Sequence, residues 1–96
     1  MVKHIVMWRM KPEVTQEQIA EMKAQLEGLK GKIDELIDIE VGIDFQRKEA
    51  SSDVSLYSVF NDEAGLQAYA IHPEHLKVVD FVKPLVAERR VVDYNG

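Results

Sequence analysis

The fold is decided by residues 37–45, IDIEVGIDF, where an apolar side chain occupies every second position. Successive side chains of a β-strand point to opposite faces of a sheet, so this alternation predicts a strand with one buried face. A polar stretch, residues 46–52, comes next, and the apolar segment 54–60 follows it. The order strand, polar loop, strand predicts a β-hairpin at the centre of the fold.

The residues before this hairpin predict a strand and then a helix. Residues 2–10 alternate as a strand does, and Pro12 ends that segment. Thr15 and Gln18 form a capping-box pattern, in which each side chain can bond to the other residue's backbone N–H. One apolar stripe follows at spacings of three and four, which is the helical period, through Ile19, Met22, Leu26, Leu29 and Ile33. Gly31 is a plausible stop for this helix.

The residues after the hairpin predict two short helices and a last strand. Asn61 and Asp62 offer an N-cap for a helix over 63–71. Proline disfavours helical geometry in the residue before it but suits the first turn of a helix, so His72-Pro73 predicts a break and a new helix. Pro84 ends that helix, and residues 88–94 predict the final strand.

The predicted order is β-α-β-β-α-β, with the second helical segment broken in two. This is an α+β, ferredoxin-like arrangement with a four-stranded antiparallel sheet, and residues 1–96 form one domain. The helices would cover one face of the sheet. Both faces of the strands carry apolar residues, so a second copy of the same sheet is the simplest cover for the other face. The sequence therefore predicts a homodimer.

Composition narrows the range of functions. The chain has 96 residues, a net charge of −5 and no cysteine. The negative charge gives no general attraction to nucleic acid or to an anionic membrane. The lack of cysteine excludes disulfides, thiolate metal sites and a cysteine nucleophile. No apolar stretch is long enough for a signal peptide or a membrane span, so we predict a cytoplasmic protein that binds neither nucleic acid nor membrane.

The histidines are the candidates for chemistry. The chain has three, His4 in the first strand and His72 and His75 beside the helix break. The break could turn Tyr69 and His75 toward the space between helices and sheet, where a neutral imidazole accepts a proton and a phenol donates a hydrogen bond to a carbonyl. His4 could face the same space. In the alternative interpretation, His72 caps the helix and His75 is a partly buried, hydrogen-bonded histidine.

A metal site at the histidines is not predicted. His72 and His75 are three apart, but no metalloprotease motif or second ligand cluster accompanies them.

Two other residues, Asp93 and Trp8, each allow two interpretations. Asp93 could orient a histidine or form a rim pair with Tyr94. Trp8 could line a pocket or pack in the core. There is no phosphate-binding loop and no nucleophile elbow.

Segments spread over the whole chain together resemble the stress-responsive A/B barrel (Dabb) family. They are VKHIV (2–6), AYAIHPEH (68–75), FVKPL (81–85) and VVDY (91–94). The resemblance implies a ferredoxin-like subunit whose sheet packs against its twin's in a dimeric α/β barrel, with the helices outside. Most members have no assigned activity, and some plant members are stress-associated.

One plant member of this family is a polyketide cyclase that performs an aldol condensation without a cofactor. The resemblance to it implies Tyr69 and His75 as catalytic residues, with His75 as the base. It implies His4 and His72 as further histidines near the site and Asp93 as the acidic residue beside it.

The chain departs from that cyclase at the positions that line the cyclase pocket. Its first helix carries Met22, Lys23 and Leu26 where the cyclase has bulky aromatics, and Trp8 replaces a smaller residue and could fill the cavity. The family also implies a possible Mg²⁺ on backbone carbonyls of residues 31–36, and no other cofactor is expected. Two functions follow: a small-molecule-binding or stress-associated homodimer, or a cofactor-independent enzyme that uses a His-Tyr pair on a carbonyl compound.

Overall fold

The computed structural model describes residues 1–96 and has four strands and three α-helices. In chain order they are β1 (Val2–Met10), α1 (Gln16–Glu27), β2 (Asp38–Ile43), β3 (Val54–Phe60), α2 (Glu63–Ala70), α3 (Pro73–Val82) and β4 (Val86–Asn95). The sheet has the order β2-β3-β1-β4, and all neighbouring strands are antiparallel. The predicted ferredoxin-like α+β fold is confirmed.

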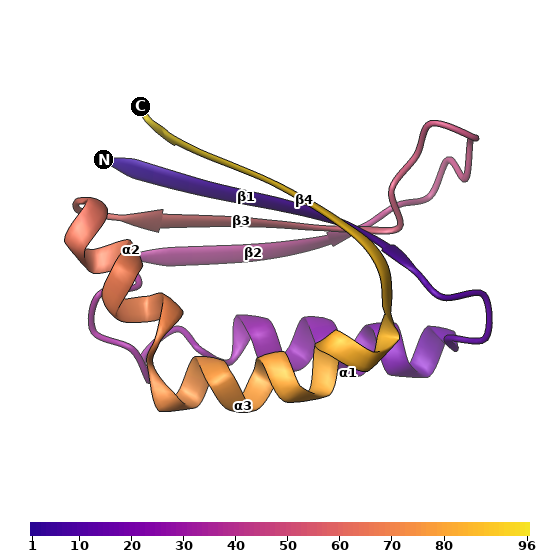
Figure 1. The fold of residues 1–96 in the computed structure, drawn as a ribbon, viewed down its shortest axis with the longest axis horizontal. Helices are drawn as coiled ribbons and strands as arrows, with labels where there is room; N and C mark the ends of the chain where they lie inside the picture. The colour runs from indigo at the N-terminus through magenta and orange to yellow at the C-terminus, as the bar shows by residue number, and fades with distance from the viewer.

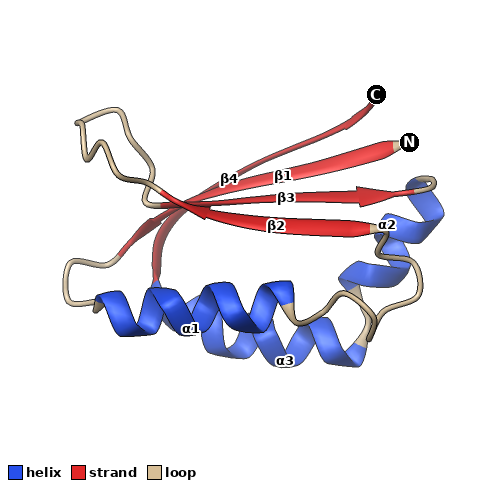
Figure 2. Cartoon of the chain, turned by 180° about the vertical axis from the view of Figure 1, so that it is seen from behind, coloured by secondary structure: helices blue, strands red, loops and turns tan.

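Helices α1 and α3 run side by side along one face of the sheet, and α2 lies at the end of the sheet (Figure 1, Figure 2). The opposite face carries no helix. No helix has the length and apolar character that crossing a membrane requires.

Local sequence signals start the helices where predicted. Thr15 caps α1, and both hydrogen bonds of the capping box are present. Asp62 caps α2 by accepting from the N–H of Gly65 at 2.8 Å. Pro73 occupies the first turn of α3.

The predicted end of the first helix is wrong by one turn. Helix α1 ends at Glu27, before Gly31. The Leu29 N–H bonds to the Leu26 carbonyl, three residues back, so the helical ladder gives way to turns there. Gly31 has φ +90°, a backbone conformation that glycine adopts without strain. Leu29 and Ile33 are nevertheless buried, but they enter the core from these turns.

Two strand boundaries also differ from the predictions. Strand β2 stops at Ile43, so Phe45 lies in the loop and is 85% exposed. Strand β4 begins at Val86, two residues before the predicted start, because it pairs with Met10 of β1 through a register shift.

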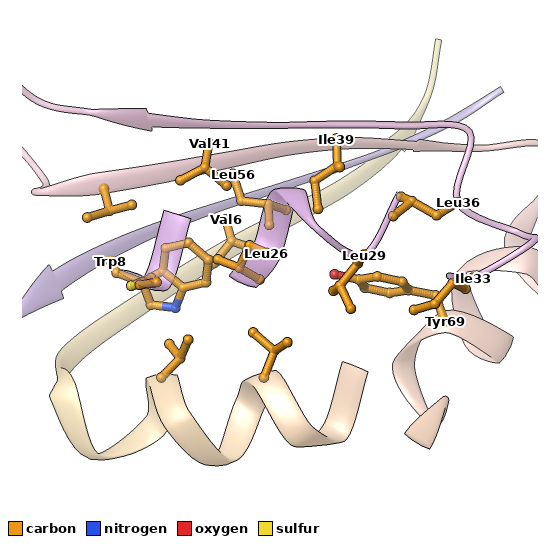
Figure 3. Packing of buried hydrophobic residues seen from close by; sticks show 14 of the residues in the cluster. Val6, Trp8, Leu26, Leu29, Ile33, Leu36, Ile39, Val41, Leu56 and Tyr69 are labelled. Carbon is orange, nitrogen blue, oxygen red and sulfur yellow. The ribbon is translucent and has the colours of Figure 1, made fainter. Parts of the chain in front are cut away.

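The core lies between the helices and the sheet. Figure 3 shows Val6, Trp8 and Leu56 of the sheet facing Leu26 of α1, with Tyr69 entering from α2. These side chains are all buried.

The helix-free face of the sheet carries an exposed apolar row. Ile5 of β1 is in register with Tyr57 of β3 and with Val92 of β4, so these side chains share one face. Met7 and Tyr94 lie on the same face of β1 and β4. Met7, Tyr57, Val92 and Tyr94 are 37–53% exposed.

Candidate functional site

A cavity of about 600 Å³ lies between α3 and strands β1 and β4, with Leu26 of α1 and Leu56 of β3 also in its wall. Most of its wall is aliphatic. The polar or charged side chains in its lining are His4, Tyr69, His75, Lys83, Glu88 and Arg89. Its size and its few polar groups are typical of small-molecule sites.

The break between α2 and α3 brings Tyr69 and His75 together. Tyr69 lies in the last turn of α2, and His75 lies in the first turn of α3. Between them the backbone leaves the helical region at His72, which precedes Pro73. The two ring centroids are 4.2 Å apart.

A single hydrogen bond defines the tautomer of His75. Its Nδ1 lies 3.1 Å from the carbonyl oxygen of Ala70. A carbonyl can only accept, so Nδ1 carries the hydrogen and donates it. In the neutral ring Nε2 then holds a free lone pair.

The surroundings of His75 favour its neutral form. Burial lowers the pKa of His75, the Ala70 hydrogen bond raises it, and Coulombic interactions with His4, Arg89 and His72 lower it further. At neutral pH the ring is therefore a proton acceptor through Nε2.

Tyr69 presents a hydroxyl that is protonated and has no protein partner. Burial raises the pKa of Tyr69 to about 12, and the positive charge of Arg89 acts in the opposite direction. Its ring packs on Phe60 at a centroid distance of 5.0 Å. No fully enclosed side-chain polar atom lacks a partner, so the Tyr69 hydroxyl, which has none, borders open space in the cavity. Figure 3 shows this hydroxyl at the inner end of the ring.

His4 and Asp93 form a pair next to Tyr69. They are register partners on β1 and β4, and His4 Nδ1 bonds to the Asp93 carboxylate. The His4 ring lies edge-on to Tyr69 at a centroid distance of 6.3 Å. Asp93 thus reaches the site only through His4, whose ring it orients.

The two remaining predicted site residues differ in their position: Trp8 lines the cavity and His72 does not. His72 Nδ1 accepts from the N–H of Glu74 at 3.1 Å, so His72 caps α3 and does not line the cavity. Trp8 combines both interpretations, since its ring is buried in the core and also lines the cavity without filling it.

The residues of α1 that differ from the plant cyclase, Met22, Lys23 and Leu26, do not place a charge in the cavity. Lys23 bonds to Glu27 and to the carbonyl of Val41, at the side of β2. Met22 is completely buried in the core. Of these three positions only Leu26 lines the cavity.

Three charged residues of the cavity lining, Lys83, Glu88 and Arg89, were not predicted as site residues. The strand alternation that pairs Arg89 with Trp8 puts it on the same face as Asp93, and that periodicity was the signal available.

A Mg²⁺ ion on the backbone carbonyls of residues 31–36 stays a prediction from the family resemblance. The carbonyl of Ile33, within this segment, already accepts a backbone hydrogen bond, and so does that of Leu29 in the turn before it. No group of three or more His, Asp or Glu side chains is placed to hold a metal ion.

The pKa of His75 predicts how stability depends on pH. The folded-state pKa lies below the ordinary value of 6.5, so the unfolded chain binds more protons between the two values. The contribution of neutral His75 is complete above about pH 6.5 and is lost as the pH falls through the folded pKa. We expect the free energy of unfolding of His75→Gln to fall less steeply than that of wild type between pH 7 and 5 in urea titrations. Parallel curves would contradict this.

Comparisons with known proteins add to this geometry. The model of the family described as "Stress responsive A/B Barrel Domain" matches residues 2–96. A dimeric protein of unknown function with a ferredoxin-like fold from Bacteroides fragilis is 31% identical, with a TM-score of 0.89, over 99% of this chain and 95% of that chain. A dimeric ferredoxin-like protein of unknown function from Thermobifida fusca is 26% identical, with a TM-score of 0.90, over 99% of this chain and 90% of that chain.

A hydroxynitrile lyase from Passiflora edulis is 23% identical, with a TM-score of 0.86, over 97% of this chain and 90% of that chain. At this identity the likeness concerns the fold alone. No curated protein matches the chain by sequence.

Proposed function

The chain belongs to the stress responsive A/B barrel domain family, and we propose that it is a homodimer whose subunits each bind a small, largely apolar molecule with a carbonyl or hydroxyl group. The binding site is the cavity between α3 and the sheet. A stress-associated role and a cytoplasmic location stay predictions from the sequence.

The observation that carries the binding proposal is the pairing of Tyr69 with His75 inside an aliphatic cavity. The cavity holds about 600 Å³, enough for a small organic molecule. The Tyr69 hydroxyl can donate to a ligand oxygen, and His75 Nε2 can accept from a ligand hydroxyl. No hydrogen bond within the chain occupies either group, so both are free to bond to a ligand oxygen.

The helix-free face of the sheet supports the homodimer. Its apolar row runs across β3, β1 and β4 through Tyr57, Ile5 and Val92. A contiguous apolar face of this kind is uncommon on a monomer. The relatives from Bacteroides fragilis and Thermobifida fusca are described as dimeric and share this fold. A second copy that packs sheet against sheet would bury the row on both subunits.

Filling the cavity should abolish binding. Val79 lines the cavity from α3 and is half-buried. Val79→Phe places a ring in the open volume, so we expect the neutral fluorescent probe N-phenyl-1-naphthylamine to bind at least about tenfold more weakly than to wild type. The measurement is a fluorescence titration.

Leu76→Phe is the matched control, because Leu76 is on the same helix, is exposed and does not line the cavity. Its affinity should equal that of wild type. If the probe does not bind wild type, or binds Val79→Phe equally well, the cavity is not the binding site.

A second candidate function, cofactor-independent proton abstraction next to a carbonyl, has its own supporting observation. The Ala70 carbonyl fixes His75 in the tautomer with a free Nε2, as a general base requires. His75 would take a proton from the carbon beside the carbonyl. The Tyr69 hydroxyl would donate to the carbonyl oxygen and stabilise the enolate charge that develops there. His4, held by Asp93, lies behind Tyr69.

Deuterium exchange tests this second function. Wild type in D₂O is expected to accelerate the exchange of the protons beside the carbonyl of octan-2-one, followed by proton NMR. His75→Gln should reduce the protein-dependent rate by about 10²-fold to 10⁴-fold, which is the usual contribution of a general base. An unchanged rate in His75→Gln, or no acceleration by wild type, would restrict the protein to binding.

A further inference from the structure

Two basic side chains in the cavity wall have no partner in the chain. Lys83 and Arg89 line the cavity, and neither makes a side-chain hydrogen bond or an ion pair. Of the ten other lysines and arginines, five are paired with carboxylates, in the contacts Lys23–Glu27, Lys30–Asp38, Lys77–Glu74, Arg9–Glu88 and Arg90–Glu88, and five are not. Glu88 is the only acidic residue in the cavity lining, and Arg9 and Arg90 already bind its carboxylate.

The position of Arg89 directs its charge at the cavity. Arg89 is in register with Trp8, whose ring lies in the core on the helix side of the sheet. Its positive charge acts on both rings of the candidate site, since it lowers the pKa of Tyr69 and that of His75. The guanidinium therefore lies near enough to influence a ligand in the same space.

Along α3, the cavity wall is polar at both ends and aliphatic between them. His75 is in the first turn of α3, and Lys83 follows the last turn, which puts them about 12 Å apart along the helix axis. Between them the wall of α3 is aliphatic, with Val78, Val79 and Val82.

We propose that the ligand of this cavity is an aliphatic carboxylic acid, bound as its anion by Arg89 with Lys83 as the second positive charge. The proposal rests on the function proposed above and names its ligand class. The aliphatic chain packs along Val78, Val79 and Val82, and an oxygen farther along it reaches Tyr69 and His75. A planar carboxylate matches the fork of the guanidinium, and the unpaired state of Arg89 leaves that fork free.

Competition with the neutral probe tests the charge of the ligand. Octanoate and octanamide have the same chain and nearly the same shape, but only octanoate is charged. Octanoate is expected to displace N-phenyl-1-naphthylamine from wild type about tenfold more effectively than octanamide, which is the effect of one charge-assisted pair at a partly exposed site. Raising the salt concentration should reduce this preference.

Arg89→Gln should remove the preference for octanoate over octanamide, which is a ratio measured within the variant itself. Lys83→Gln should reduce the preference more weakly. Arg47→Gln is the control, because Arg47 lies in the exposed loop between β2 and β3 and does not line the cavity. It should behave as wild type.

The outcomes separate this inference from the function on which it rests. If the probe binds but octanoate and octanamide compete equally, or neither competes, the cavity stands and the anion inference is wrong. If octyl phosphate competes at least tenfold better than octanoate, the carboxylate assignment is wrong. If the probe itself fails to bind wild type, both proposals fall.

Discussion

Tyr69→Ala is expected to lower the free energy of unfolding by about 3–5 kcal/mol, the range for deleting a buried aromatic ring. Tyr69 is 2% exposed and contacts the rings of Phe60 and His75, so the substitution removes packing between α2, α3 and the sheet. Urea unfolding at a fixed protein concentration measures this loss. The concentration must be fixed because the stability of a dimer depends on it.

Tyr69→Phe separates packing from chemistry. The ring stays, and the missing hydroxyl had no partner in the protein, so the change in unfolding free energy should stay below about 1.5 kcal/mol. The neutral probe should still bind, whereas the exchange reaction proposed for His75 should slow because the enolate loses its donor. If Tyr69→Phe is as unstable as Tyr69→Ala, the hydroxyl has a structural role that contradicts the assignment of it to the ligand.

Val92→Asp is expected to convert the proposed dimer to a monomer. Val92 lies in the apolar row on the helix-free face and is 53% exposed in the single chain. A carboxylate in this apolar row would lose its hydration when the two sheets pack together. The cost of several kcal/mol per charge should weaken dimerisation at least about 100-fold.

Val91→Asp is the matched control for Val92→Asp. Val91 is the adjacent residue of the same strand, is 48% exposed, and points to the helix side. Both variants place the same residue in the middle of β4, so the cost of aspartate in a strand is shared. Sedimentation velocity should find Val92→Asp monomeric and Val91→Asp dimeric. If Val92→Asp stays dimeric, the interface lies elsewhere.

The parts of the fold that depend on local chemistry could be predicted from the sequence. Thr15, Asp62 and Pro73 each start a helix through bonds or dihedral restrictions within a few residues. The end of α1 could not be placed, because Gly28 and Gly31 offer alternative stops and the buried Leu29 and Ile33 continue the apolar spacing beyond the helix.

Part of the candidate site could also be predicted from the sequence, and part could not. The break at Pro73 predicted that Tyr69 and His75 would meet, since both flank the same turn. For His72, the family resemblance implied a place near the site, whereas the alternative interpretation from the sequence, a cap of the helix, is what the structure shows, since His72 accepts from the N–H of Glu74. Arg89 could not be found because its role depends on which strand pairs with β4 and in which register.

Through its alternation, strand β4 would take part in both proposed functions, ligand binding and dimerisation. Arg89, Val91 and Asp93 belong to the helix side of the sheet, and Arg90, Val92 and Tyr94 belong to the helix-free side. Under these proposals, substitutions in the first set would change the preferred ligand while the second set keeps the subunits together, so ligand preference could change without loss of the dimer. A deletion of one residue inside β4 has the opposite effect, because it exchanges the two sets and would disrupt both functions in a single mutational step.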